Sequence, residues 1–283
     1  MKYADLIKDK EEYIERFKKY IFNRKGGENL LGYIVNKTDF FTAPASTKYH
    51  MSTAGGLCRH SLNVDDALCE LMFTPGTIWN QYAIDKGITR ETVAVVALLH
   101  DICKTNFFVE GAKNQKTYDP VKVAAAPQKD VKRDARGEYI WESIPVYEIE
   151  DKCPFGHGEK SAYIVGNYIH LSLDELLAIR WHMGFSAAES FVDRSPLNCA
   201  MVMSPLVLAT HLADITATHL MEEEKNGYEV KKEISKAEID GVTEIVEETF
   251  ENVTAPELPA EVVQATTTAY DDIDLDELAT LFG

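Results

Sequence analysis

The strongest constraint on this chain is an apolar segment that ends in an adjacent histidine and aspartate. Every residue from Val93 to Leu99 is apolar, and His100 and Asp101 follow. A helix that is hydrophobic all round is a buried helix, and a buried charge is normally paired or bound to a metal. On a helix, His100 and Asp101 would lie about 100° apart, with Lys104 on the same face. The segment therefore predicts either a metal-binding pair or a His–Asp hydrogen bond near a helix end.

Length and composition favour an intracellular globular protein. The 283 residues are enough for one large domain or two small ones, and 45% of them are hydrophobic. No apolar run approaches the ~20 residues of a membrane span, and residues 1–10 are charged, unlike a signal peptide. The five cysteines include no C-x-x-C pair, which is typical of reduced thiols. We therefore expect a cytoplasmic protein with no membrane contact.

The negative charge is concentrated at the C-terminus. Residues 222–283 hold 18 acidic and 4 basic side chains, a net of −14, so only −3 of the total of −17 belongs to residues 1–221. A near-neutral body without a basic surface argues against nonspecific binding to duplex DNA. We expect residues 222–283 to form an acidic extension that contains a helix at 235–250, a linker and a tail.

The end of this tail carries an apolar stripe. Leu275, Leu278 and Phe282 recur at helical spacing among five acidic residues. Residues 270–282 are therefore either a short helix that docks in a groove of a protein partner or of another copy of the chain, or a disordered solubilising tail.

Two regions flank or interrupt the expected core. Residues 3–22 have apolar positions at helical spacing, which predicts that residues 1–45 form an N-terminal helical segment packed on the core. Residues 105–153 combine prolines, two-residue alternation and a turn signal, which predict a loop and β-hairpin insertion. Seven basic residues lie in the first part of this insertion: Lys113, Lys116, Lys122, Lys129, Lys132, Arg133 and Arg136. They form either a basic flap that attracts an anionic substrate or an ordinary solvated hairpin.

Four more side chains are candidates for a polar site. His60 shares the apolar stripe of a helix that follows two glycines, and so points inward. His157 lies between two glycines, where the backbone can approach a neighbour closely. His182 lies in the last turn of a helix that begins with a Ser–Glu capping box. Asp214 is the one acid inside the last core helix and needs a counter-charge.

Together these positions form a set of metal-ligating residues. The set combines four imidazoles with two carboxylates: His60, His100, Asp101, His157, His182 and Asp214. Such donors, without a cysteine, suit Fe, Mn, Ni, Co or Zn at a site that water can reach, with Mg as a further candidate.

The order of these residues resembles that of the HD-domain metal-dependent phosphohydrolase superfamily. The resemblance runs through the segments GGLCRHS, LLHDICK, PFGHGEKS, AIRWHMG and HLADITA, so it covers about residues 46–221. The first and third segments are most similar to bacterial and phage HD proteins and to the HD domain of some 3′→5′ exoribonucleases. One position departs from the pattern, because Cys103 stands where the family usually has glycine.

The resemblance implies an all-α HD-domain core at residues 46–221 that holds two divalent transition metals. The ligands implied for the first metal are His60, His100, Asp101 and Asp214. The ligands implied for the second metal are His157 and His182, with Asp101 bridging both metals.

The activity implied by the resemblance is hydrolysis of a phosphoester by a hydroxide that bridges the metals. A phosphodiesterase acting on a nucleotide or nucleic-acid-derived substrate is the first expectation, because dinuclear sites often cleave diesters. The alternatives are a nucleotide phosphomonoesterase or triphosphohydrolase, and a catalytically inactive adaptor that recruits a partner through its tail. Lys104, beside the catalytic Asp101, would stabilise charge on phosphate oxygens, and Arg59, Lys160 and Arg180 would bind the substrate.

Overall fold

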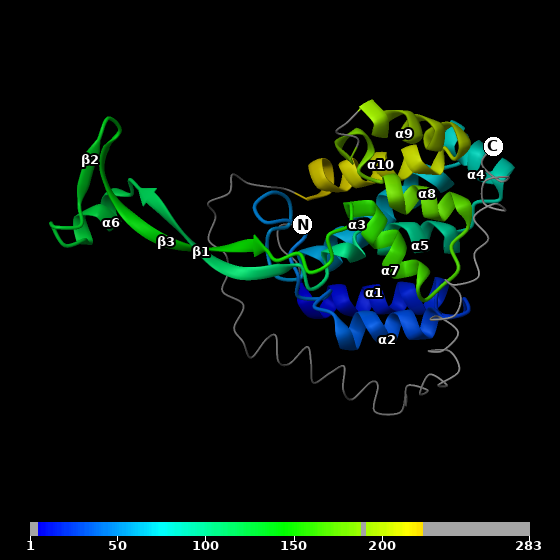
Figure 1. Cartoon of the computed structure of the whole chain (residues 1–283), viewed down its shortest axis with the longest axis horizontal. Coiled ribbons are helices and arrows are strands. Elements are labelled where there is room, and N and C mark those ends of the chain that lie inside the picture. Colours follow the sequence, from blue (N-terminus) through cyan, green and yellow to red (C-terminus); the bar gives the residue numbers. More distant parts are fainter. Residues whose placement is uncertain (1–4, 188–190, 223–283) are drawn as a thin grey trace, which may run out of the picture. The chain divides into compact units, whose positions relative to one another are not determined.

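The chain forms a helical body and a small antiparallel sheet (Figure 1). The computed structural model describes residues 5–187 and 191–222. The elements in chain order are α1 (Leu6–Tyr20), α2 (Gly27–Lys37), α3 (Gly56–Phe73), α4 (Ile78–Lys86), α5 (Arg90–Leu99), η1 (Ile102–Lys104), β1 (Phe108–Thr117), α6 (Pro120–Ala125), β2 (Lys132–Asp134), β3 (Gly137–Ile149), α7 (His157–Gly166), α8 (Leu173–Trp181), η2 (Gly184–Ala187), α9 (Phe191–Met203), α10 (Leu206–Thr216) and the π-helical turn η3 (Ala217–Met221). The prediction of a mainly helical protein with a β-hairpin is confirmed. The predicted C-terminal helix, linker and tail lie outside the described residues.

Helix α5 is the centre of the core. The side chains from Val93 to Leu99 have no exposed surface, and α1, α3 and α8 all pack against this helix. Burial of each large aliphatic side chain contributes about 1.5–3 kcal/mol. The position of α5 is therefore strongly determined, and so is the point at which the chain leaves it, at His100.

The glycine pair before α3 sets how that helix begins. Gly55 has a φ of +75°, which glycine adopts without strain. A Cβ at Gly56 would overlap the carbonyl oxygen of Met51, so the backbone approaches too closely for any other residue. The predicted inward direction of His60 is confirmed, because the residue is only 1% exposed.

Helices α7 and α8 pack closely through a second glycine. A Cβ at Gly158 would overlap the carbonyl oxygen of Arg180, which explains the close backbone approach predicted beside His157. The capping box that begins α8 is also confirmed, since Ser172 and Glu175 exchange side-chain to backbone hydrogen bonds. These contacts bring the start of α7 next to the end of α8.

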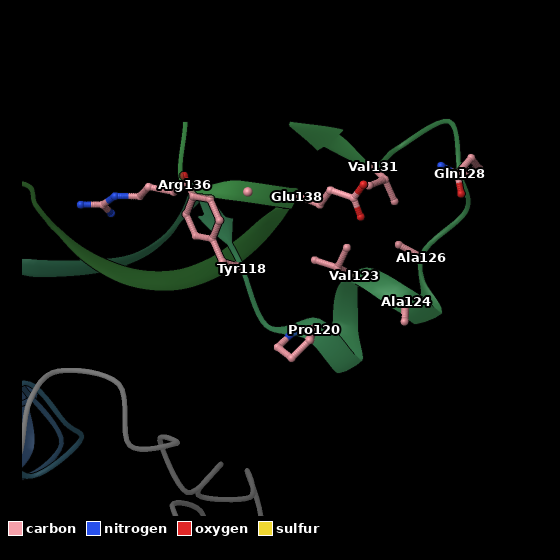
Figure 2. Close-up of a pocket in the computed structure, with 10 residues that line it drawn as sticks. Tyr118, Pro120, Val123, Ala124, Ala126, Gln128, Val131, Arg136 and Glu138 are labelled. Carbon is pink, nitrogen blue, oxygen red and sulfur yellow. The ribbon is translucent and has the colours of Figure 1, made fainter. Parts of the chain in front are cut away.

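The insertion at 105–153 forms a long two-stranded ribbon that leads away from the helices (Figure 1). Strands β1 and β3 pair antiparallel from Phe108↔Ile149 to Thr117↔Ile140, and β2 pairs with β3 beyond that point. At about 3.3 Å per residue, β1 alone covers roughly 30 Å. A pocket of about 430 Å³ lies at the far end, between α6 and the turn into β3, with Tyr118, Val123 and Arg136 among its lining residues (Figure 2).

Membrane-spanning potential is weak among the described helices. None of them taken singly has the length and apolar composition needed to cross a bilayer. One consecutive pair, Arg194–Met203 with Leu206–Met221, meets those criteria only jointly, and the two helices are bent by 105° relative to each other.

Candidate metal centre

Five helices bring the six predicted ligands together. The side chains are His60 of α3, His100 and Asp101 just after α5, His157 at the start of α7, His182 just after α8, and Asp214 of α10. Successive histidine rings lie 4.8–5.2 Å apart between centroids. His157 and Asp214 are the more exposed members, with 31% and 14% of their side-chain surface accessible, and the other four are buried.

The sequence predicted that His100, Asp101 and Lys104 share one face of a continuous helix, but the helix ends before them. The helix stops at Leu99, and Lys104 belongs to a separate 3₁₀ turn. Asp101 joins the two elements with φ −106° and ψ 14°, in the bridge region of backbone conformations. The turn points the Asp101 carboxylate back towards residues of several helices.

The two oxygens of Asp101 face different groups of side chains. Oδ2 lies 3.4 Å from His100 Nε2 and 3.6 Å from His60 Nε2. Oδ1 lies 2.7 Å from His157 Nε2 and 3.4 Å from His182 Nε2. The carboxylate, which is only 2% exposed, therefore stands between two pairs of imidazoles.

Asp214 completes the first of these groups. Its Oδ1 lies 3.2 Å from His60 Nε2, and His60 Nε2 lies 3.3 Å from His100 Nε2. Lys104 is the cation of the group, with Nζ 2.6 Å from Asp101 Oδ2.

Backbone carbonyls fix the direction of two rings. His100 Nδ1 donates to the carbonyl of Ala97 at 2.8 Å, and His182 Nδ1 donates to that of Ile179 at 2.7 Å. Because a carbonyl only accepts, Nδ1 of each ring carries a proton, and Nε2 is the ring nitrogen that faces the centre. The Nε2 of His182 is buried and has no hydrogen-bond partner among the described residues. Metal-ligating histidines are typically oriented in this way.

Glu222 is a site residue that the sequence analysis missed. Its Oε1 lies 2.9 Å from His60 Nδ1 and accepts a hydrogen bond from Asn63 Nδ2 at 3.0 Å. The residue is only 3% exposed, although the sequence assigned it to the acidic extension. The contact orients His60 so that its Nε2 faces Asp101 and Asp214. No local pattern signals it, because 162 positions separate Glu222 from His60.

His50 is a second residue that was missed. Its ring centroid lies 4.8 Å from that of His60, and its buried Nε2 has no hydrogen-bond partner among the described residues. Burial, aided by the charges of His60 and Lys104, lowers the pKa of His50 to about 4. His50 is therefore a neutral imidazole at physiological pH, beside the His60–Glu222 pair.

The electrostatics of the centre keep its carboxylates ionised. Burial by itself would raise the pKa of Asp101, but Lys104 and His100 bring it well below its ordinary value. The pKa of Asp214 is also lowered, since His60 outweighs the effect of burial. Burial lowers the pKa of His60, but the carboxylates of Glu222 and Asp214 raise it to about 10. Negative charge is thus available at both carboxylates, and a proton occupies His60 until something displaces it.

The basic residues predicted to bind substrate each pair with a carboxylate. Two of these residues have further constraints. Arg59 is only 5% exposed, and the guanidinium carbon of Arg180 lies 3.8 Å from the centroid of the Trp181 ring, on which it stacks. The pairs are Arg59 with Asp9 at 3.0 Å, Lys160 with Asp151 at 2.6 Å, and Arg180 with Glu159. Their role in substrate binding stays a prediction.

Cys103 also enters the centre, which the sequence analysis did not anticipate. The residue lies in the 3₁₀ turn η1 and has no positive φ, so a side chain is tolerated where glycine was expected. Its Sγ lies 3.2 Å from His157 Nδ1. The described cluster therefore contains imidazole, carboxylate and thiol donors.

This cluster can hold a metal ion. Its donor atoms fall into overlapping groups of three within 4.8 Å of one another, and Asp101 belongs to two of these groups. Imidazole, carboxylate and thiolate are the usual ligands of transition metals in proteins. The buried, unpartnered Nε2 of His182 also fits such a role, because a lone buried polar atom is costly.

Glu222 offers the first test of this centre. We expect Glu222→Gln to weaken metal binding about 10- to 100-fold, as is usual when a partner of a metal-ligating histidine is lost. The glutamine keeps the shape and one oxygen but removes the charge that makes His60 more basic. Metal retained after dialysis against a chelator measures the effect. Glu150→Gln, at an exposed carboxylate, is the matched control, and equal retention by both variants would contradict the assigned role.

Comparisons with known proteins do not extend this description. No family model matches the chain, no curated protein matches its sequence, and no solved structure matches its fold.

Proposed function

We propose that this chain is an HD-type metal-dependent phosphohydrolase, and specifically a phosphodiesterase that acts on a nucleotide or nucleic-acid-derived substrate. The six residues that carry the resemblance come from five separate segments of the sequence, yet their side chains converge. Because a helical fold alone would not require this convergence, the convergence supports the resemblance. The all-α HD core at 46–221 is part of the same proposal.

The observation that carries the proposal is the position of Asp101 between two sets of donors. Its Oδ2 faces His60 and His100, and its Oδ1 faces His157 and His182. A carboxylate in this position suits a bridge between two metals. Paired metals supply Lewis acidity for in-line displacement at phosphorus and lower the pKa of water.

The residues of the chain would contribute position and charge. The five ligands around Asp101 would orient the centre, and the more exposed His157 and Asp214 would mark its open side. Lys104 is held by Asp101 Oδ2 and keeps 14% of its side-chain surface exposed. Its ammonium group can therefore neutralise Asp101 and also reach an anionic phosphate oxygen at the edge of the site.

A combined metal and activity assay tests the proposed function. Protein purified without chelator is analysed for bound metal, then assayed on a phosphodiester, a phosphomonoester and a nucleoside triphosphate with Mn²⁺, Ni²⁺, Co²⁺ and Mg²⁺. We expect two metals per chain and preferential cleavage of the diester. One metal with preference for the monoester or triphosphate would favour a nucleotide phosphatase, and an empty, inactive centre would favour the adaptor.

The raised pKa of His60 predicts how metal binding depends on pH. A metal must displace the proton that His60 holds, because only the neutral ring has a lone pair at Nε2. With a pKa of about 10, that proton is bound throughout the neutral range. We therefore expect the affinity for the first metal to rise about tenfold per pH unit between pH 6.5 and 8.5. Titration in metal-buffered solutions measures it, and an affinity independent of pH would contradict a protonated His60.

The ribbon predicts a dependence on substrate length. Lys116 and Lys122 pair with Asp134 and Glu142, and the other five bases of 105–136 have no ion pair with any described residue. One of the five, Arg136, lines the pocket at the end of the ribbon, and the remaining four are Lys113, Lys129, Lys132 and Arg133. Salt at 0.1 M screens charges that are more than about 10 Å apart, and this distance is short compared with the length of the ribbon. These four bases should therefore act on an oligonucleotide and not on a mononucleotide.

We expect replacement of these four bases by glutamine to raise KM several-fold for an oligonucleotide diester at low salt. KM for a small diester should stay unchanged, and the salt dependence for the oligonucleotide should weaken. The control is the double variant Lys122→Gln/Glu142→Gln, which removes a charge pair without changing the net charge. An unchanged KM for the oligonucleotide would assign the ribbon to ordinary solvated surface.

A further inference from the structure

Cys103 is held against His157 at the edge of the centre. Its Sγ lies 3.2 Å from His157 Nδ1 and 3.8 Å from His157 Nε2. The Cys103 backbone N–H donates to Ser161 Oγ at 3.2 Å, which ties the 3₁₀ turn to α7. The residue is only 3% exposed, so the thiol faces the protein and not the solvent.

The thiol belongs to one of the groups of donor atoms that can hold a metal. Sγ of Cys103, a carboxylate oxygen of Asp101 and a ring nitrogen of His157 lie within 4.8 Å of one another. In a tetrahedral site with metal–sulfur and metal–nitrogen bonds of about 2.3 and 2.0 Å, the two ligand atoms lie about 3.5 Å apart. The separation of 3.8 Å between Sγ and Nε2 is close to this value. The His157 ring is partly exposed, and a small rotation of it would bring Nε2 to the separation from Sγ that two ligands of one metal have.

A second observation points to the same position. His182 Nε2 is buried and has no hydrogen-bond partner among the described residues, and it lies 3.4 Å from the same Asp101 oxygen that contacts His157. An unpaired buried polar atom costs about 1–3 kcal/mol. A ligand shared by these side chains would remove that cost.

We infer that the thiolate of Cys103 is a ligand of the second metal position, together with Asp101, His157 and His182. This inference rests on the proposed two-metal function and adds to it a metal preference. Thiolate is a soft ligand that favours zinc, cobalt or ferrous iron, whereas manganese and magnesium prefer oxygen ligands. Binding converts the thiol to thiolate and releases its proton to solvent. The first position, whose side chains are imidazoles and carboxylates, has no such preference.

Cobalt(II) provides a direct readout, because thiolate bound to it absorbs in the near ultraviolet through sulfur-to-metal charge transfer. The full-length protein is stripped of metal, loaded with Co²⁺ and examined by absorption spectroscopy. We expect the band in the wild-type protein and its loss in Cys103→Ser and Cys103→Ala. Cys199→Ser, which removes an exposed thiol, should keep the band. Circular dichroism and a melting curve of each variant show whether it is folded.

Metal competition gives a second readout. With equal Zn²⁺ and Mn²⁺, the ratio of zinc to manganese bound should fall at least about tenfold in Cys103→Ser, within the range seen when one contact of a metal site is lost. Two cobalt ions per chain without the charge-transfer band, or a band that survives Cys103→Ser, would overturn the thiolate ligand and leave the two-metal function standing. Failure of the folded wild-type protein to bind cobalt at all would overturn both.

Discussion

The Asp101→Ala variant is expected to lose both metals and to show at least about a thousandfold lower kcat/KM, equivalent to about 4 kcal/mol. The physical reason is that Asp101 has one oxygen within 3.6 Å of His60 and His100 and the other within 3.4 Å of His157 and His182. Removing it takes one anionic ligand from each position and the negative charge that offsets two bound cations. His100 also lies beside both groups, since its ring centroid is 4.8 Å from that of His182, but it offers only its Nε2 to the centre.

The alanine variant also leaves Lys104 without its carboxylate partner. Because 14% of the Lys104 side chain is exposed, this loss costs less than the about 3–5 kcal/mol of a fully buried pair. Asp101→Asn separates this effect from metal loss, because it keeps the volume and an oxygen that Lys104 can still contact. Metal content and turnover of both variants are measured beside Asp134→Asn, which removes a carboxylate of the ribbon. A folded Asp101→Asn protein that retains two metals would show that Asp101 does not bridge them.

The parts of the centre that the sequence predicted all have local signals. The direction of His60 follows from the apolar stripe of its own helix, and the start of α8, which leads to His182, follows from its capping box. The burial of His100 and Asp101 follows from the wholly apolar α5 before them. In each case, residues within two turns of the side chain determine where it points.

The remaining features depend on contacts between distant segments. Glu222 reaches His60 across 162 positions, and Arg59 reaches Asp9 across 50. An arginine beside a candidate ligand has the same local sequence whether it binds substrate or pairs with a carboxylate. The thiol of Cys103 enters the centre because α7 packs on the 3₁₀ turn, which no local pattern indicates.

His182→Ala tests the second metal position with less risk to the fold. Among the described residues, the hydrogen bond of this ring is the one that Nδ1 donates to the carbonyl of Ile179, and a hydrogen bond of this kind contributes about 0.5–1.5 kcal/mol. Its buried Nε2 has no partner among the described residues, so its removal also eliminates an unfavourable group. The metal-free variant should therefore melt within a few degrees of the metal-free wild-type protein.

The metal-loaded proteins should differ much more. His60, His100, Asp101 and Asp214 remain in His182→Ala, so we expect one metal per chain where the wild-type protein holds two. Turnover of a diester should fall about a hundredfold or more, because the second metal no longer stabilises the leaving or attacking oxygen. His170→Ala, which removes an exposed histidine of the α7–α8 connection, should keep both metals. Retention of two metals by His182→Ala would contradict its place in the second position. Loss of both would show that the two positions fill only together, because a bridging Asp101 couples the binding at one to the binding at the other.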